Sequence, residues 1–132
     1  MNQVGIPNID KQLEASLIID MKKVEDLMRS HIQGDYPLVV ETSRHLVEAG
    51  GKRLRPLLTL ISAQFGDPTN YDIIKAAVCC ELTHLATLYH DDVMDDAVLR
   101  RGVISANKKW NNAVAILTGD YLFSKVSDML AD

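Results

Sequence analysis

Apolar residues recur along most of the chain with the period of an α-helix. They return every three or four positions, which would place them on one face of each helix, and polar residues fill the positions between. Helices are predicted at about residues 9–31, 36–49, 56–63, 71–95 and 105–132. An alternating pattern of the kind that marks a strand is not evident. The sequence therefore predicts an all-α fold.

Glycine and proline mark the boundaries between these helices. Residues 1–8 are expected to form a loose arm, after which either Asn8 or Asp10 can cap the first helix. Helix ends are expected at Gly34, at Gly50-Gly51 and at Gly66-Asp67-Pro68. Within the last predicted helix, Gly119 is expected to allow another helix to approach closely.

Composition narrows the class of protein. The 132 residues are 47% hydrophobic and 24% charged, which is typical of one soluble globular domain. The net charge of −4 gives no indication of a nucleic-acid partner, and the apolar runs are too short to span a membrane. Cys79 and Cys80 are neighbours that cannot face each other on a helix, so we expect two free thiols and a cytoplasmic protein. The N-terminus shows no secretory signal.

Four carboxylates follow an apolar run at the end of the fourth predicted helix. Asp91 and Asp95 are four residues apart and would share one face, and His84, seven residues before Asp91, lies on nearly the same face. Like charges this close repel unless a cation lies between them, and carboxylate oxygens on one helical face suit Mg²⁺. The alternative is a solvated acidic helix end, but an apolar lead-in is unusual for such a surface.

A basic cluster precedes the third predicted helix. Lys52, Arg53 and Arg55 crowd its N-terminus, where the helix dipole disfavours cations. The arrangement suits a bound anion such as diphosphate, although an exposed basic turn remains an equal alternative. Arg100 and Arg101 follow the fourth helix, where they would complement the dipole.

These motifs, in this order and spacing, resemble the N-terminal half of the trans-type isoprenyl diphosphate synthases. The matching segments are Gly51-Lys52-Arg53-Leu54-Arg55-Pro56, Asp91-Asp92-Val93-Met94-Asp95, Arg100-Arg101-Gly102 and Gly119-Asp120. The resemblance implies an antiparallel helix bundle of the isoprenoid synthase type. It also implies that residues 1–132 are the N-terminal part of a single domain, because the second Asp-rich motif of the family is absent. The chain alone is therefore expected to be inactive.

The resemblance also implies a reaction and a role for each motif residue. A Mg²⁺-dependent prenyltransferase would join isopentenyl diphosphate to an allylic diphosphate, with Asp91 and Asp95 as the metal ligands and Arg100 on the allylic diphosphate. Asp92 and Asp96 would play supporting parts. The diphosphate of isopentenyl diphosphate would be held by Lys52, Arg55, His84 and Arg101.

The residues before the Asp-rich motif are expected to control product length. In the family they line the product tunnel, and the positions here are Ala86, Thr87, Thr83 and Cys80. All are small, so we expect a medium- or long-chain polyprenyl product, which would be handed to a membrane. The same stripe of small residues is also typical of close helix packing.

Two other functions are compatible with the motifs. The chain could be a non-catalytic binding or regulatory subunit of a heteromeric prenyl synthase. It could also come from a terpene cyclase, although a cyclase needs no basic site for isopentenyl diphosphate. This chain is expected to form a homodimer or a larger assembly, because apolar faces meant for absent helices would be exposed.

Overall fold

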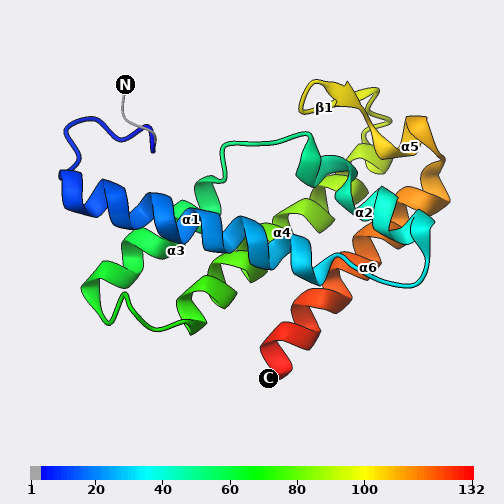
Figure 1. Ribbon diagram of the computed structural model, residues 1–132. Helices are drawn as coiled ribbons and strands as arrows, with labels where there is room; N and C mark the ends of the chain where they lie inside the picture. The colour runs from blue at the N-terminus through cyan, green and yellow to red at the C-terminus, as the bar shows by residue number, and fades with distance from the viewer. Residues whose placement is uncertain (1–3) are drawn as a thin grey trace.

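The computed structural model describes residues 4–132, so the first part of the expected N-terminal arm, residues 1–3, lies outside it. Figure 1 shows helices joined by short connections and one small hairpin. The helices are α1 (Lys11–His31), α2 (Pro37–Glu48), α3 (Leu54–Ser62), α4 (Asp72–Met94), α5 (Ala106–Lys109) and α6 (Asn112–Ala131), with a short 3₁₀ turn η1 (Ala63–Phe65). None of the helices within residues 4–132 is both long enough and apolar enough to cross a membrane.

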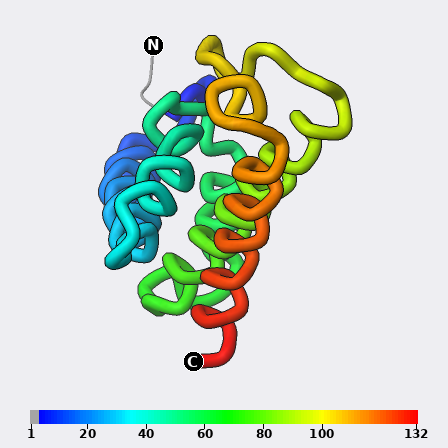
Figure 2. Tube along the Cα trace, turned by 90° about the vertical axis from the view of Figure 1, so that its right-hand side faces the viewer, coloured from blue at the N-terminus to red at the C-terminus, as the bar shows by residue number. Residues whose placement is uncertain are grey.

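Helix α4 lies at the centre of the bundle. It packs on α6, α3 and α1, and Figure 2 shows α1 and α6 on opposite sides of it. Its apolar side chains are buried around most of its circumference, which explains why its residues are hydrophobic on several faces. The buried apolar residues are Ile74, Ala77, Val78, Cys79, Leu82, Leu85, Ala86, Leu88 and Tyr89.

Local signals account for several helix starts. The Asp10 carboxylate accepts the backbone N–H groups of Gln12 at 3.1 Å and Leu13 at 3.0 Å, so Asp10, one of the two predicted caps, begins α1. Pro37 occupies the first turn of α2, where its missing N–H costs nothing. These local features fix where α1 and α2 begin, independently of packing in the core.

Tyr89 and Gly119 join α4 to its neighbours. The hydroxyl of the fully buried Tyr89 donates to the carbonyl of Thr42 at 2.5 Å and accepts the N–H of Leu46 at 3.2 Å, which ties α4 to α2. A Cβ at Gly119 would lie 3.0 Å from the carbonyl oxygen of Ala86 and closer still to the ring of His90. The predicted close approach of a helix at Gly119 is confirmed, and the partner is α4.

The sequence-based expectation was wrong in two places near the C-terminus. The last predicted helix is two helices, because Trp110 leaves the helical region and the extended Asn111 restarts it by accepting the N–H of Val114 at 2.8 Å. The chain also contains an unpredicted hairpin, β1 (Leu99–Arg100) with β2 (Val103–Ile104). Strands of two residues are too short to show alternation, and positive φ values at Arg101 and Gly102 form the tight turn between them.

Candidate functional site

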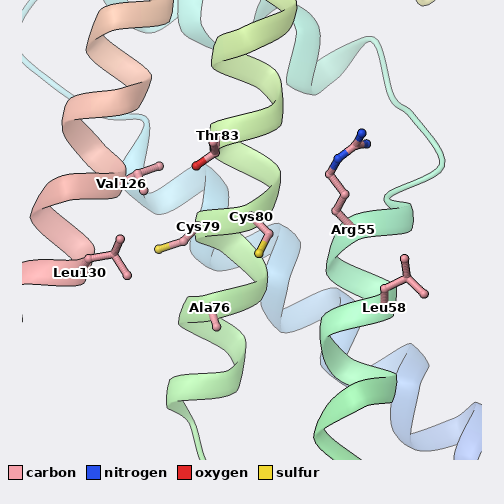
Figure 3. A pocket seen from close by; sticks show the side chains of 8 residues that line it. All are labelled: Arg55, Leu58, Ala76, Cys79, Cys80, Thr83, Val126 and Leu130. Carbon is pink, nitrogen blue, oxygen red and sulfur yellow. The ribbon is translucent and has the colours of Figure 1, made fainter.

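Two cavities lie beside α4, and Arg55 lines both. The larger, of about 640 Å³, is apolar and lies between α3, α4 and α6. Figure 3 shows Ala76, Cys80 and Thr83 along α4, with Val126 on α6 to one side and Arg55 on α3 to the other. The lining is completed by Leu58, Cys79 and Leu130. This cavity can hold a hydrocarbon chain, because the small side chains on α4 leave the space beside the helix unfilled.

The smaller cavity, of about 350 Å³, is strongly basic. All four residues predicted to hold a diphosphate line it, although they come from three separate parts of the chain: Lys52, Arg55, His84 and Arg101. Neither Lys52 nor Arg55 forms an ion pair with any residue of the described part of the chain. Two unpaired cations in one concave site are suited to a multiply charged anion.

The backbone before α3 is shaped to present these cations. Gly50, Gly51 and Arg53 all have positive φ values, and α3 begins immediately afterwards at Leu54. A Cβ at Gly51 would lie 2.9 Å from Cζ of Arg101, so a side chain there would displace the guanidinium. Glycine is needed at this position both for its backbone conformation and for the approach of Arg101.

Arg53 has a structural place that the sequence-based analysis did not assign. It is only 8% exposed, and its Nε lies 2.5 Å from Glu25 on α1. Its other nitrogens donate to the carbonyls of Val47 at 3.0 Å and Gly50 at 3.1 Å, both at the end of α2. Arg53 therefore anchors the loop that carries Lys52 and Arg55.

Glu81 is the residue of the site that the sequence-based analysis missed. Its side chain is 1% exposed, and its Oε1 lies 3.5 Å from Nη1 of Arg53 and 3.5 Å from Nη2 of Arg101. Arg101 also donates to the carbonyls of Leu46 at 3.0 Å and Gly50 at 2.5 Å. A single carboxylate within the apolar sequence of α4 was the available signal, because buried charges are rarely left unpaired.

Burial governs the electrostatics of the basic cavity. It raises the pKa of Glu81, against the opposing effect of Arg53 and Arg101, and it lowers the pKa of Arg101. Burial is also the largest cause of a lowered pKa at His84, and the positive charges of Arg55 and Arg101 add to it. His84 is therefore neutral at pH 7 and takes up a proton more readily when an anion is present.

The four carboxylates at the end of α4 divide into two classes. Asp92 is 1% exposed, and its Oδ1 accepts Nε and Nη2 of Arg100 at 2.8 and 2.6 Å. Asp96 pairs with Lys108 at 2.6 Å. Asp91 is half-buried and Asp95 exposed, and neither has an ion pair or side-chain hydrogen bond within residues 4–132. The two predicted metal ligands are thus the two carboxylates of the four that form no ion pair, although the positive charge of Arg100 acts on both.

Asp91 and Asp95 have the chemistry of a partial metal site. The N–H of Asp95 donates to the carbonyl of Asp91 at 2.8 Å, so the two residues are one helical turn apart and face the same side. A cluster of three or more metal-binding side chains is not found in the described part of the chain. Two carboxylates suit a hard cation such as Mg²⁺, which takes its remaining ligands from water and phosphate oxygens.

The residues expected to control product length lie in different surroundings. Cys80 and Thr83 line the apolar cavity. Thr87 is half-buried and lies one turn closer to Asp91 on the same face of α4. Ala86 is fully buried, and its carbonyl is in the close contact with Gly119 rather than at the cavity.

Comparison with known proteins gives consistent matches. The family model described as "Polyprenyl synthetase" matches residues 36–132. Nonaprenyl diphosphate synthase from Mycobacterium tuberculosis is 44% identical over 128 residues, which cover 96% of this chain and 38% of that protein. Heptaprenyl diphosphate synthase component 2 from Bacillus subtilis is 45% identical over 114 residues, covering 84% of this chain and 32% of that protein. The chain thus spans only a minor part of the length of these relatives.

Solved structures share the fold. A decaprenyl diphosphate synthase from Rhodobacter capsulatus matches 92% of this chain and 38% of its own, with a TM-score of 0.85 and 40% identity. A polyprenyl synthase from Caulobacter crescentus, in complex with calcium and isoprenyl diphosphate, matches 90% of this chain and 36% of its own, with a TM-score of 0.85 and 38% identity. The predicted all-α fold of the isoprenoid synthase type is confirmed.

Arg53 and Arg55 provide a direct test of how the basic loop is built. Arg53→Met leaves the buried Glu81 and its neighbour Glu25 with fewer cations and removes one hydrogen bond from each of the carbonyls of Val47 and Gly50, so it should lower the free energy of unfolding by about 3 kcal/mol. Arg55→Met, at the exposed and unpaired arginine two residues later, should change it by no more than about 0.5 kcal/mol. Urea unfolding followed by circular dichroism measures both. Equal effects of the two substitutions would contradict the anchoring role of Arg53.

Proposed function

The chain belongs to the polyprenyl synthetase family, and from this premise we propose that it forms part of a trans-polyprenyl diphosphate synthase. In this proposal the complete protein joins isopentenyl diphosphate to an allylic diphosphate. The observation that carries the proposal is the contrast of unpaired charges around α4: Lys52 and Arg55 in the basic cavity, and Asp91 and Asp95 at the helix end. Neither set forms an ion pair within residues 4–132, and one of the substrates, or its metal, would supply the partner.

The basic cavity is the proposed site for the diphosphate of isopentenyl diphosphate. Lys52 and Arg55 supply free positive charge, and Arg101 is held toward the cavity by Glu81 and by two backbone carbonyls. His84 is neutral in the absence of substrate and can donate a further hydrogen bond once the anion favours its protonation. The anion would thus meet one cation that is already held in place, Arg101, and two that are free to turn toward it, Lys52 and Arg55.

Asp91 and Asp95 are the proposed ligands for Mg²⁺, and Arg100 the proposed contact to the allylic diphosphate. When bound, Mg²⁺ would stabilise the negative charge that develops on the leaving diphosphate. Arg100 binds Asp92 through Nε and Nη2, which leaves Nη1 free to donate to a substrate oxygen. The bond to Asp92 also keeps the guanidinium in one orientation.

The apolar cavity is the proposed start of the product channel. Its wall on α4 is formed by small residues, with Cys80 and Thr83 at the positions expected to limit chain length. The small side chains on the α4 side of this lining, with no aromatic residue among them, favour a medium- or long-chain product. Such a product is strongly apolar, and transfer to a membrane is part of the proposal. Thr87 and Ala86 remain predicted length residues, although only Thr87 lies on the same face of α4 as Thr83.

A heteromeric assembly is the second candidate. One relative is named as component 2 of a heptaprenyl diphosphate synthase, so a protein similar to this chain is one component of a larger enzyme. In that case the chain would bind diphosphate as one subunit, in the cytoplasm, beside a partner with the remaining groups. A homodimer or larger assembly of the complete protein is the simpler expectation. The mass of the purified complex, measured with and without co-expressed neighbours, separates the two.

The metal ligands can be tested by substitution in the complete protein. Asp91→Asn keeps the size of the side chain but removes a charge that would hold Mg²⁺, so prenyl transfer should fall at least 100-fold, about 3 kcal/mol of transition-state stabilisation. The assay follows transfer of radiolabel from isopentenyl diphosphate to a prenyl product. Asp72→Asn, at the far end of the same helix, should retain normal activity. Full activity of Asp91→Asn with unchanged Mg²⁺ dependence would overturn the metal assignment.

His84 should make diphosphate binding depend on pH. The pKa of His84 is lowered in the free protein, and a bound anion raises it again, so binding takes up a proton. As pH falls toward and below 6.5, wild-type affinity for inorganic diphosphate should rise relative to that of His84→Gln. Titration calorimetry without metal, at several pH values, measures the ratio of the wild-type affinity to that of His84→Gln. The protonation of diphosphate itself affects both proteins equally and therefore cancels in this ratio. A ratio that does not change with pH would remove His84 from the site.

Thr83 provides the test of product length. Thr83→Phe places an aromatic ring in the apolar cavity and should shorten the products, because the ring and a growing prenyl chain cannot share the space. Thr83 suits this test better than Ala86, where a ring would disrupt the contact of α4 with α6. Ala15→Phe, exposed on α1, is the control. Product chromatography that shows an unchanged length distribution for Thr83→Phe would place the channel elsewhere.

A further inference from the structure

The turn that ends α4 has a strained but fully hydrogen-bonded form. The N–H of Asp96 donates to the carbonyl of Val93 at 3.3 Å, and the N–H of Ala97 donates to the carbonyl of Asp92 at 2.9 Å. This pair of bonds defines a Schellman motif, in which the residue after the cap adopts the left-handed conformation. Asp96 holds that conformation here with φ of 50°, where glycine would be the usual choice.

The short segment at the start of α5 closes over this turn. Asn107 donates from Nδ2 to the carbonyls of Asp92 at 3.2 Å and Ala97 at 3.0 Å. The hydroxyl of Ser105 donates to the same Ala97 carbonyl at 2.6 Å, and Lys108 pairs with Asp96 at 2.6 Å. Three side chains from four consecutive residues thus bind the turn that follows Asp91.

Asn107 is the central contact of the three. It is 6% exposed, and its amide group has only one possible orientation, because the reverse would place Oδ1 against two carbonyl oxygens. The contact joins the two ends of the turn directly, since Asp92 lies in the last turn of α4 and Ala97 just beyond the cap. Rotation of the turn about Asp95 would break this bridge.

We propose that Asn107 is a positioning residue for the carboxylate pair Asp91 and Asp95, an inference that rests on the proposed function. Asp95 is the cap residue of α4, so its side-chain direction follows the conformation of the turn that Asn107 holds. Asp92 lies between the two ligands, and its carbonyl is bound both by Ala97 and by Asn107. Groups that hold metal ligands in place commonly contribute about 10- to 100-fold in metal affinity.

The test compares three variants of the complete protein. Asn107→Leu keeps the shape of the side chain and removes the donor. Asn107→His places a ring N–H near the position of Nδ2 and keeps a donor. Asn112→Leu, on the exposed first turn of α6, is the matched control. The affinity for Mn²⁺ in the presence of inorganic diphosphate is measured by electron paramagnetic resonance, and metal-free diphosphate affinity by calorimetry.

Asn107→Leu should weaken Mn²⁺ binding about tenfold or more, with metal-free diphosphate affinity unchanged, because the basic cavity is built from other contacts. Asn107→His should recover most of the Mn²⁺ affinity, and Asn112→Leu should match the wild type. Hydrogen exchange at the Ala97 amide should be faster in Asn107→Leu only. If that variant does not fold, Asn107→Ser, whose donor is too short to bridge both carbonyls, takes its place.

Two results would overturn the inference while leaving the proposed function intact. One is an Mn²⁺ affinity of Asn107→Leu equal to that of the wild type. The other is a parallel loss of Mn²⁺ binding and metal-free diphosphate binding, which would show that Asn107 supports the fold as a whole. If the wild type binds no Mn²⁺, or Asp91→Asn binds it equally well, the proposed function itself fails.

Discussion

The buried carboxylate of Glu81 holds together the parts of the molecule that carry the basic cavity. It lies between Arg53 and Arg101 and compensates their buried positive charges. Both arginines also donate to the carbonyl of Gly50. One point on α4 therefore joins the end of α2, the loop before α3 and the turn of the hairpin. Because an unpaired charge in this position would be costly, the three segments are held in one arrangement.

This arrangement divides each charged motif into anchored and free residues. Arg53 is held by its contacts with Glu25, Glu81 and two carbonyls, and it is not available to a ligand. Lys52 and Arg55, on either side of it, are exposed and form no ion pairs within the described residues. The acidic motif follows the same pattern, with Asp92 bound to Arg100 while Asp91 forms no ion pair within the described residues. The buried member of each motif fixes the backbone, and its neighbours are thereby presented to a ligand.

Different faces of α4 contribute to the apolar cavity and to the basic cavity. Toward the middle of α4, Cys80 and Thr83 line the apolar cavity with small side chains. His84, which follows Thr83 in the sequence, lines the basic cavity. Successive positions on a helix point about 100° apart, which is enough to direct neighbours into different cavities. The turn beyond Asp95 completes the helix, and the contacts from Ser105, Asn107 and Lys108 limit how far that end can move.

The sequence by itself determined the helical class, the position of the main helices, the cap at Asp10 and the close approach at Gly119, because each depends on local spacing or on the size of a single residue. Its resemblance to the isoprenyl diphosphate synthases also implied that Lys52, Arg55, His84 and Arg101 form one group, and these residues line one cavity. It could not separate anchored from free charges, since that depends on which partners lie opposite: Glu25 and Glu81 are 28 residues from Arg53 in either direction. The sequence also could not predict the two-residue strands or the break at Trp110, because these features depend on tertiary contacts and leave no periodic pattern. Only the tertiary structure decided that Glu81 belongs to the basic cavity, that Ala86 lies outside the apolar one, and that Asn107 reaches the helix end, because each of these requires segments distant in the chain to meet.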